Sequence, residues 1–83
     1  MNLAVNKPKA GEDVNRYSVV SSNISTVGYD IAERVLEVEF KSGGVYQYSN
    51  VPEYEYKALL TASSLGAYLN KHILNVYQDK KIK

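Results

Sequence analysis

Residues 36–52 constrain the fold of this chain more than any other segment. They begin by alternating apolar with acidic side chains, as Leu36-Glu37-Val38-Glu39-Phe40. Such alternation predicts a strand with one buried face. The glycines of Ser42-Gly43-Gly44 tolerate the positive φ angles of a tight turn, and Val45–Asn50 predicts the returning strand. The segment is therefore a β-hairpin, and Pro52 after it suits the first position of a helix.

Further elements flank the hairpin. Asn23–Tyr29 is rich in β-branched residues and predicts an earlier strand. Glu53 and Glu55 favour a helix start after the proline, and Ser63-Ser64 supplies caps for a second helix. Its apolar positions recur every three or four residues: Leu65, Tyr68, Leu69, Ile73, Val76 and Tyr77. We expect an α+β fold, a three-stranded antiparallel β-meander followed by two helices packed on one face (β-β-β-α-α).

The domain organisation follows from the 83-residue length, which suits a single domain. Residues 1–16 are polar, carry Pro8 and Gly11, and predict an N-terminal arm that docks on the body or on a partner. Residues 17–78 form the domain, and residues 79–83 form a basic C-terminal tail.

The hairpin loop decides which face of the sheet carries Tyr46 and Tyr48, because a slip of one residue exchanges the two faces. A two-residue loop places both rings beside the glutamates, where they could form a stacking platform. A three-residue loop, Ser42-Gly43-Gly44, sets Lys41 opposite Val45 and places the rings with the apolar residues. We favour the second because it gathers the large apolar side chains on one face. It predicts a shared core of Phe40, Tyr46, Tyr48, Leu59, Leu69 and Ile73.

Residue types exclude several kinds of chemistry. The chain has no cysteine and a single histidine, His72, so a thiolate nucleophile, a disulfide and a multi-histidine metal site are not available. We expect no enzymatic activity, no metal and no cofactor. The acidic pair Glu37/Glu39 is interpreted as a solvated strand face, and the pair Glu53/Glu55 is interpreted as part of a helix N-terminus. No apolar run approaches the roughly 18 residues of a membrane span, and a cytoplasmic location is expected.

The order of several motifs resembles the KTSC domain, a module named for the C-terminus of some lysyl-tRNA synthetases. The resemblance runs from about Ser18 to Tyr77 and rests chiefly on Tyr46-Gln47-Tyr48 and on Ser64-Leu65-Gly66-Ala67-Tyr68-Leu69-Asn70. It implies a small module that also occurs in stand-alone bacterial and phage proteins. RNA binding is suggested for the family from its synthetase association.

We therefore expect a small non-enzymatic binding module for RNA or a nucleotide-like anion. The expected ligand residues are Tyr46, Tyr48, Ser63, Ser64, Gly66, Asn70 and Lys71. The alternative is a protein-interaction module of a phage or mobile element, which binds a host factor or sequesters a small nucleotide signal. A homodimer is expected from an unpaired sheet edge or from the arm.

Overall fold

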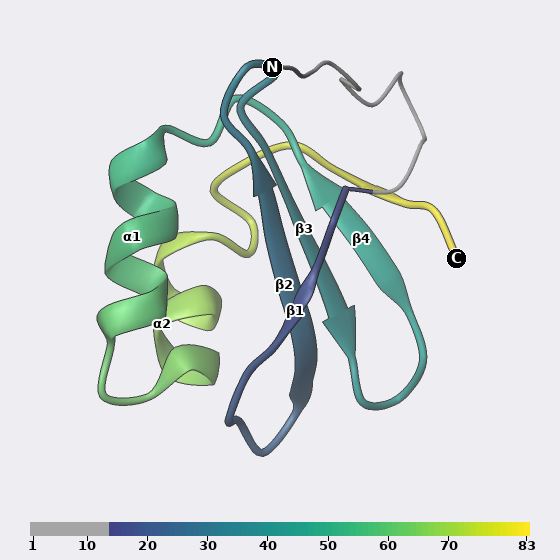
Figure 1. Ribbon diagram of the computed structural model, residues 1–83, viewed down its shortest axis with the longest axis vertical. Coiled ribbons are helices and arrows are strands. Elements are labelled where there is room, and N and C mark those ends of the chain that lie inside the picture. Colours follow the sequence, from purple (N-terminus) through teal and green to yellow (C-terminus); the bar gives the residue numbers. More distant parts are fainter. Residues whose placement is uncertain (1–13) are drawn as a thin grey trace, which may run out of the picture.

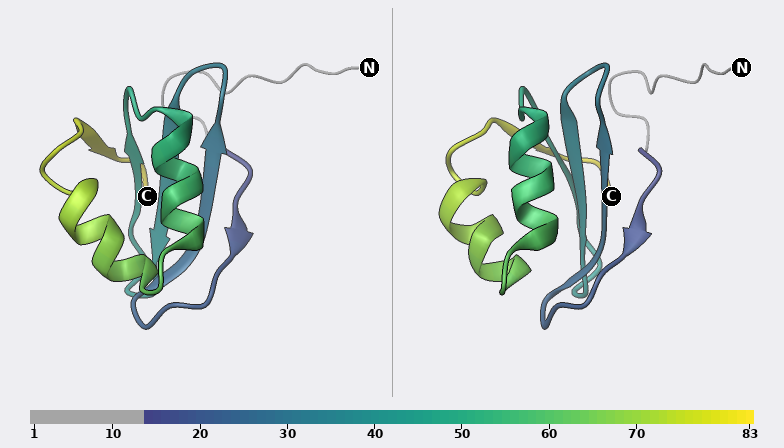
Figure 2. Two further views of the ribbon diagram at one scale, coloured as in Figure 1. Left: turned by 90° about the vertical axis from the view of Figure 1, so that its left-hand side faces the viewer. Right: turned by 60° about the vertical axis from the view of Figure 1, so that its left-hand side comes forward.

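A five-stranded antiparallel sheet runs in the order β1-β2-β3-β4-β5, and two helices cover one of its faces (Figures 1 and 2). The computed structural model describes residues 14–83. Most of the predicted arm, residues 1–13, lies outside the described residues. The elements are β1 Tyr17–Ser18, β2 Ile24–Asp30, β3 Val35–Phe40, β4 Val45–Tyr48, α1 Glu53–Thr61, α2 Leu65–His72 and β5 Asp79–Lys81.

The predicted α+β architecture is confirmed, but the sheet has a further short strand at each edge. β1 has two residues and β5 has three, so neither is long enough to give a strand signal of its own. β5 lies in the segment expected to be a tail, and it pairs with β4 by setting Lys81 opposite Tyr46. The N–H of Ile82 also donates to the Val45 carbonyl at 2.8 Å. Tertiary pairing rather than local propensity forms these edges.

The β3–β4 hairpin has the predicted loop length but not the predicted loop position. The Phe40 N–H donates to the Gly44 carbonyl at 2.9 Å, so the loop is Lys41-Ser42-Gly43. Gly43 has a φ of 112°, which favours glycine. The register therefore sets Val45 opposite Glu39. The expected partner of Val45 was Lys41, two residues further along the chain. A shift of two residues keeps the faces, so the predicted orientation of the tyrosines is correct.

The hydrophobic core lies between the helices and the facing side of the sheet. Four of the six predicted core residues are fully buried there: Tyr48, Leu59, Leu69 and Ile73. The other two, Phe40 and Tyr46, are partly buried against the core. Their rings meet edge to face with centroids 5.8 Å apart, so the core closes at its rim with an aromatic pair.

Helix α2 ends earlier than its apolar spacing predicts. It stops at His72, and Asn75 then takes a left-handed φ of 63°, a conformation that asparagine tolerates at helix ends. The apolar helix face that the spacing predicts therefore does not extend to Val76, whose side chain is 62% exposed. Ile73 still reaches the core because it lies directly after the last helical turn.

Candidate functional site

The start of α2 has the capped geometry that the serine pair predicts. Ser64 is the N-cap, and its side chain accepts a hydrogen bond from the Ala67 N–H at 3.2 Å. Ser63 precedes it in the short link from α1 and is exposed. The cap satisfies one of the N–H groups that a helix start leaves without a helical partner.

The connection between β1 and β2 lies against this helix start. A Cβ atom on Gly66 would come within 2.7 Å of the Asn23 Oδ1 atom. Close packing therefore favours glycine at this position. Glycine has a low helix propensity, so its presence in the first turn of α2 already indicated a close contact. Ser21 shapes the same connection, since its Oγ accepts from the Ile24 N–H at 3.3 Å and donates to Asn23 Oδ1 at 3.2 Å.

Two surface hollows adjoin at the start of α2 and share Ser22 and Ser64. The first hollow, of about 440 Å³, is lined by Val19, Val20, Ser21, Ser22, Leu60, Ala62, Ser63, Ser64 and Leu65. The second hollow, of about 460 Å³, is lined by Ser22, Asn23, Phe40, Ser64, Gly66, Ala67, Leu69, Asn70 and Leu74. Both volumes lie in the range of small-ligand sites. Their polar groups are hydroxyls and carboxamides, and no Lys, Arg, Asp or Glu of the described residues is among the lining.

Four of the seven expected ligand residues line the two hollows, and Lys71, Tyr46 and Tyr48 do not. Ser63, Ser64, Gly66 and Asn70 line these hollows. Lys71 is exposed on α2 but does not line either one.

The two strand tyrosines, Tyr46 and Tyr48, line neither hollow. Tyr48 is only 1% exposed, and burial raises the pKa of its hydroxyl. Tyr46 is partly buried and packs against Phe40, which lines the second hollow. Tyr46 thus contacts a residue of the second hollow without lining it, and because both rings pack against the core, the pair forms no exposed stacking platform. Tyr46 and Tyr48 lie on the face of β4 that packs against the core, and Gln47 between them lies on the opposite face, where it bonds to Glu37.

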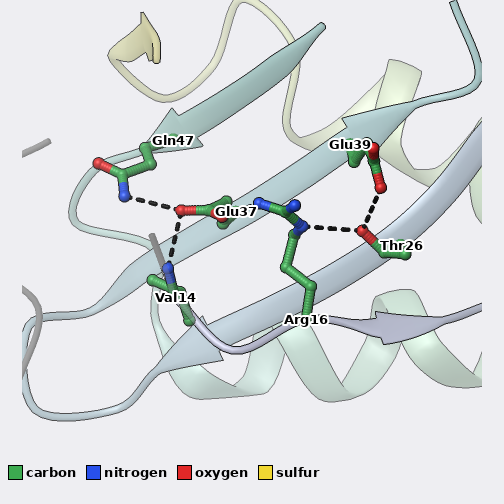
Figure 3. Close-up of polar contacts among 6 residues, drawn as sticks. All are labelled: Val14, Arg16, Thr26, Glu37, Glu39 and Gln47. Atoms are coloured by element: carbon green, nitrogen blue, oxygen red, sulfur yellow. Dashed lines mark hydrogen bonds and ion pairs between the residues drawn. The ribbon is translucent and has the colours of Figure 1, made fainter. Parts of the chain in front are cut away.

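A second polar cluster, which the sequence interpretation missed, lies on the sheet face opposite the helices (Figure 3). Glu37 was expected to be solvated, yet it is fully buried. Its carboxylate forms an ion pair with Arg16 and accepts hydrogen bonds from the Val14 N–H at 3.0 Å and from Gln47 Nε2 at 2.8 Å. Residues 14–16, the docked segment, thus cover this face.

Two further contacts of the docked segment complete the cluster. Arg16 Nε donates to Thr26 Oγ1 at 2.9 Å, and Thr26 Oγ1 donates to Glu39 at 3.0 Å. Beneath the segment, a Cβ atom on Gly28 would lie 2.0 Å from the Asn15 carbonyl oxygen. A glycine inside a predicted strand is a recognised sign of close backbone approach, and Gly28 was the signal available in the sequence.

A third cluster surrounds Glu55 between the two helices. This carboxylate lies in the first turn of α1, as expected, but it is also only 8% exposed and accepts hydrogen bonds from the Tyr68 and Tyr77 hydroxyls. The bond to Glu55 is the main cause that raises the pKa of Tyr68 to about 12. Burial, followed by the same carboxylate, raises the pKa of Tyr77 to about 12. His72 stacks on Tyr68 with ring centroids 4.3 Å apart.

Two kinds of feature, a metal cluster and a membrane-spanning helix, are absent from residues 14–83. Within that range, no group of three or more His, Asp or Glu side chains is placed to hold a metal ion. None of the helices there is long and apolar enough to cross a membrane. Hydrogen-bonding hollows and buried polar clusters are what this part of the chain offers.

The fold and its hollows define a small α+β domain with an antiparallel sheet and a capped helix start at its exposed polar surface. Residues 20–77 match the sequence profile of the KTSC domain, and the chain belongs to that family. The match begins after the docked segment and ends before β5. The predicted resemblance is therefore confirmed.

One solved structure agrees with this assignment, and two further proteins are similar to this chain in sequence. The crystal structure of a KTSC domain protein from Yersinia pestis is 36% identical and superposes with a TM-score of 0.81, covering 83% of this chain and 97% of that one. An uncharacterized protein from Stutzerimonas stutzeri is 43% identical over 58 residues, which are 70% of this chain and 82% of that protein. A protein from Tsukamurella paurometabola is 42% identical over 52 residues, 63% of this chain and 78% of its own.

Proposed function

We propose that this protein is a small non-enzymatic binding module that takes a nucleotide unit, either free or within an RNA strand, at the start of α2. One observation carries the proposal: the two adjoining hollows share Ser22 and Ser64 and combine hydroxyls, carboxamides and a helix start. We also propose a cytoplasmic location, which suits a chain without cysteine.

The chemistry of the hollows matches the parts of a nucleotide. Backbone N–H groups at a helix start, with the positive end of the helix dipole, bind phosphate oxygens. Carboxamides such as Asn23 and Asn70 offer a donor and an acceptor side by side, which suits the edge of a base. Phe40 adds an apolar wall to the same hollow.

The neutral lining favours a short ligand over a long polyanion. Tight binding to a nucleic acid backbone normally uses several lysines or arginines and depends strongly on salt. Because no such side chain lines either hollow, we expect one or two nucleotides to be bound and the affinity to vary weakly with salt.

A protein-interaction module is the second candidate. It is favoured by Val20, which is fully exposed, and by Leu60, which is 45% exposed, both at the first hollow. Apolar side chains grouped at a rim are typical of a protein contact. In this reading the domain belongs to a phage or mobile element and binds a host factor.

Calorimetric titration tests the proposal with a panel of linear and cyclic mononucleotides and with short RNA homopolymers. We expect binding by at least one nucleotide and at least a tenfold loss of affinity in Asn70→Ala, whose side chain is exposed and lines the second hollow. Gln78→Ala is the matched control, because it removes an exposed carboxamide outside both hollows. The absence of binding across the panel, or equal losses in the two variants, would contradict the proposal.

A further inference from the structure

Two lysines lie at the end of the sheet where the β3–β4 loop meets β5 and the two residues after it. Lys41 is the first loop residue and Lys81 belongs to β5, and both side chains are exposed. The Val45 N–H donates to the Lys83 carbonyl at 3.1 Å, and the Ile82 N–H donates to the Val45 carbonyl at 2.8 Å. Backbone hydrogen bonds therefore hold this lysine end, Lys41 and Lys81, on the rigid part of the fold.

Lys81 lies on the helix side of the sheet, next to the aromatic rim of the core. The β4–β5 register sets it opposite Tyr46, and paired residues share a face. A Cβ atom on Gly44 would lie 3.1 Å from Tyr46 Cε1 and 3.8 Å from Lys81 Cε, so the ring edge and the lysine chain converge over this glycine. Gly44 has no positive φ. Its missing side chain thus serves the space beside the lysine rather than the turn.

The lysine end carries no acidic side chain that would neutralise it. Residues 40–46 and 80–83 contain neither Asp nor Glu. Within residues 14–83, the acidic side chains lie on the face that the docked segment covers (Glu37 and Glu39), at the other end of the sheet (Asp30, Glu33 and Asp79) or in the first turn of α1 (Glu53 and Glu55). Because charge is separated in this way, the lysine end attracts anions.

The second hollow reaches the lysine end through two aromatic rings. Phe40 lines the hollow, and its ring meets the Tyr46 ring edge to face at 5.8 Å. Lys41 directly follows Phe40, and its N–H donates at 2.9 Å to the carbonyl of Asn23, which is another lining residue. The neutral hollow and the two cations are therefore neighbouring parts of one surface.

We propose that Lys41 and Lys81 form a phosphate site that continues the second hollow. Each ammonium group brings three donors and a full charge, which suits a phosphate oxygen. The choice of ligand rests on the proposed function: the start of α2 takes one phosphate of a nucleotide, and the lysine end takes the next one. The preferred ligand is then a dinucleotide, because a mononucleotide with a single phosphate fills only one of the two positions.

Calorimetry compares the nucleoside 5′-monophosphate that binds best with the 5′-phosphorylated dinucleotide of the same base. The dinucleotide is expected to bind about tenfold more tightly, the gain from one charge-assisted contact. Its affinity should also fall more steeply with salt, by about 0.7 in the logarithmic slope for the added phosphate. Equal affinities and equal slopes for the two ligands would overturn the proposal.

A matched pair of lysine variants locates the second phosphate. Lys81→Gln is expected to lose the gain of the dinucleotide and to leave the mononucleotide affinity unchanged. Lys80→Gln removes the same charge from the neighbouring position of β5, but Lys80 is opposite Gln47 on the other face of the sheet. It should keep the gain. Equal losses in the two variants would show that the effect is one of net charge and would contradict a site at Lys81.

Inorganic phosphate probes the lysine end without any nucleotide. Titration followed by the NMR shifts of backbone amides is expected to move residues 42–45 and 82 more than residues 31–34 at the other end of the sheet, and Lys81→Gln should abolish the difference. Unmoved amides at millimolar phosphate would refute the site.

The two proposals fail separately. Mononucleotide binding that Asn70→Ala weakens, without a gain for the dinucleotide, refutes the lysine site and leaves the proposed function standing. If no nucleotide binds, the proposed function fails, and the titration with inorganic phosphate decides the lysine site by itself.

Discussion

Arg16 and Glu37 form an ion pair across the sheet face that the helices leave uncovered, and the Glu37 side chain has no exposed surface. The pair joins a residue outside the matched family profile to the centre of β3. Residues 14–16 belong to the segment expected to be an arm that docks on the body or on a partner, and they contact Glu37 and Thr26 of the same chain. The sheet is thus covered on both faces, by helices on one and by the docked segment on the other.

Arg16→Ala is predicted to lower the free energy of unfolding by about 3 kcal/mol, because it leaves a buried carboxylate without its charged partner. Urea denaturation of the full chain measures the change. Lys57→Ala is the control, since Lys57 pairs with Glu53 at 3.4 Å on the exposed surface of α1. Its loss should cost below about 0.5 kcal/mol. Similar effects in the two variants would mean that the docked segment does not bury Glu37.

Gly28→Ala is predicted to destabilise the domain more than Gly66→Ala. The new methyl at residue 28 would meet the Asn15 carbonyl oxygen at 2.0 Å, and this backbone group cannot rotate away without lifting the docked segment. We expect a loss of about 2 kcal/mol. At residue 66 the methyl meets the end of the Asn23 side chain at 2.7 Å, which can turn, and the gain in helix propensity offsets about 1 kcal/mol. Thermal unfolding of both variants gives the comparison.

Much of the fold is predictable from the sequence because its signals are local. Alternation in Leu36–Phe40 and the glycine turn locate the hairpin, and the serine cap locates α2. Tyr46 and Tyr48 face the core because the hairpin loop has three residues, as predicted. The loop lies one residue earlier than predicted, which shifts the strand pairing by two residues and leaves each side chain on the same face. The start of α2 is also predictable, because the serine cap is a local signal. It brings together Ser63, Ser64, Gly66 and Asn70.

The remaining features depend on contacts between distant segments. An acidic residue alternating with apolar ones predicts a solvated face, and nothing near Glu37 in the sequence reveals that Arg16 covers it. β5 carries Asp79, Lys80 and Lys81, which are poor strand formers, and it forms only because β4 offers a free edge. Glu55 is likewise buried by Tyr77, 22 residues away.

Tyr48→Ala is predicted to cost about 4 kcal/mol, because its ring is among the largest fully buried side chains of the core. Tyr46→Ala should cost less, about 2 kcal/mol, since this ring is only partly buried at the rim beside Phe40. Chemical denaturation followed by circular dichroism measures both. Equal losses would show that Tyr46 carries as much packing as Tyr48.

The tyrosines around Glu55 make the stability of the domain depend on alkaline pH. An unfolded tyrosine loses its proton near pH 10, whereas in the folded chain the pKa of both Tyr68 and Tyr77 is raised to about 12. Between these values the folded state holds protons that the unfolded state has lost. The stabilisation from these groups is therefore complete below pH 10 and disappears as the pH rises through about 12.

Tyr68→Phe is predicted to remove both the hydrogen bond and part of this pH dependence. At pH 8 the variant should be less stable by about 1 kcal/mol, because one acceptor position of the largely buried Glu55 loses its donor. From pH 10 to 12 the free energy of unfolding of the unmodified chain should fall more steeply than that of the variant, so that the two curves converge. Tyr54→Phe is the matched control, because Tyr54 is 68% exposed and donates no hydrogen bond to Glu55, and its loss should change the alkaline slope less than the loss of Tyr68 does, since Tyr54 is only a minor cause of the raised pKa of Tyr68. Urea denaturation at several pH values gives the slopes, and an equal change of slope in the two variants would show that Glu55 does not hold the Tyr68 proton.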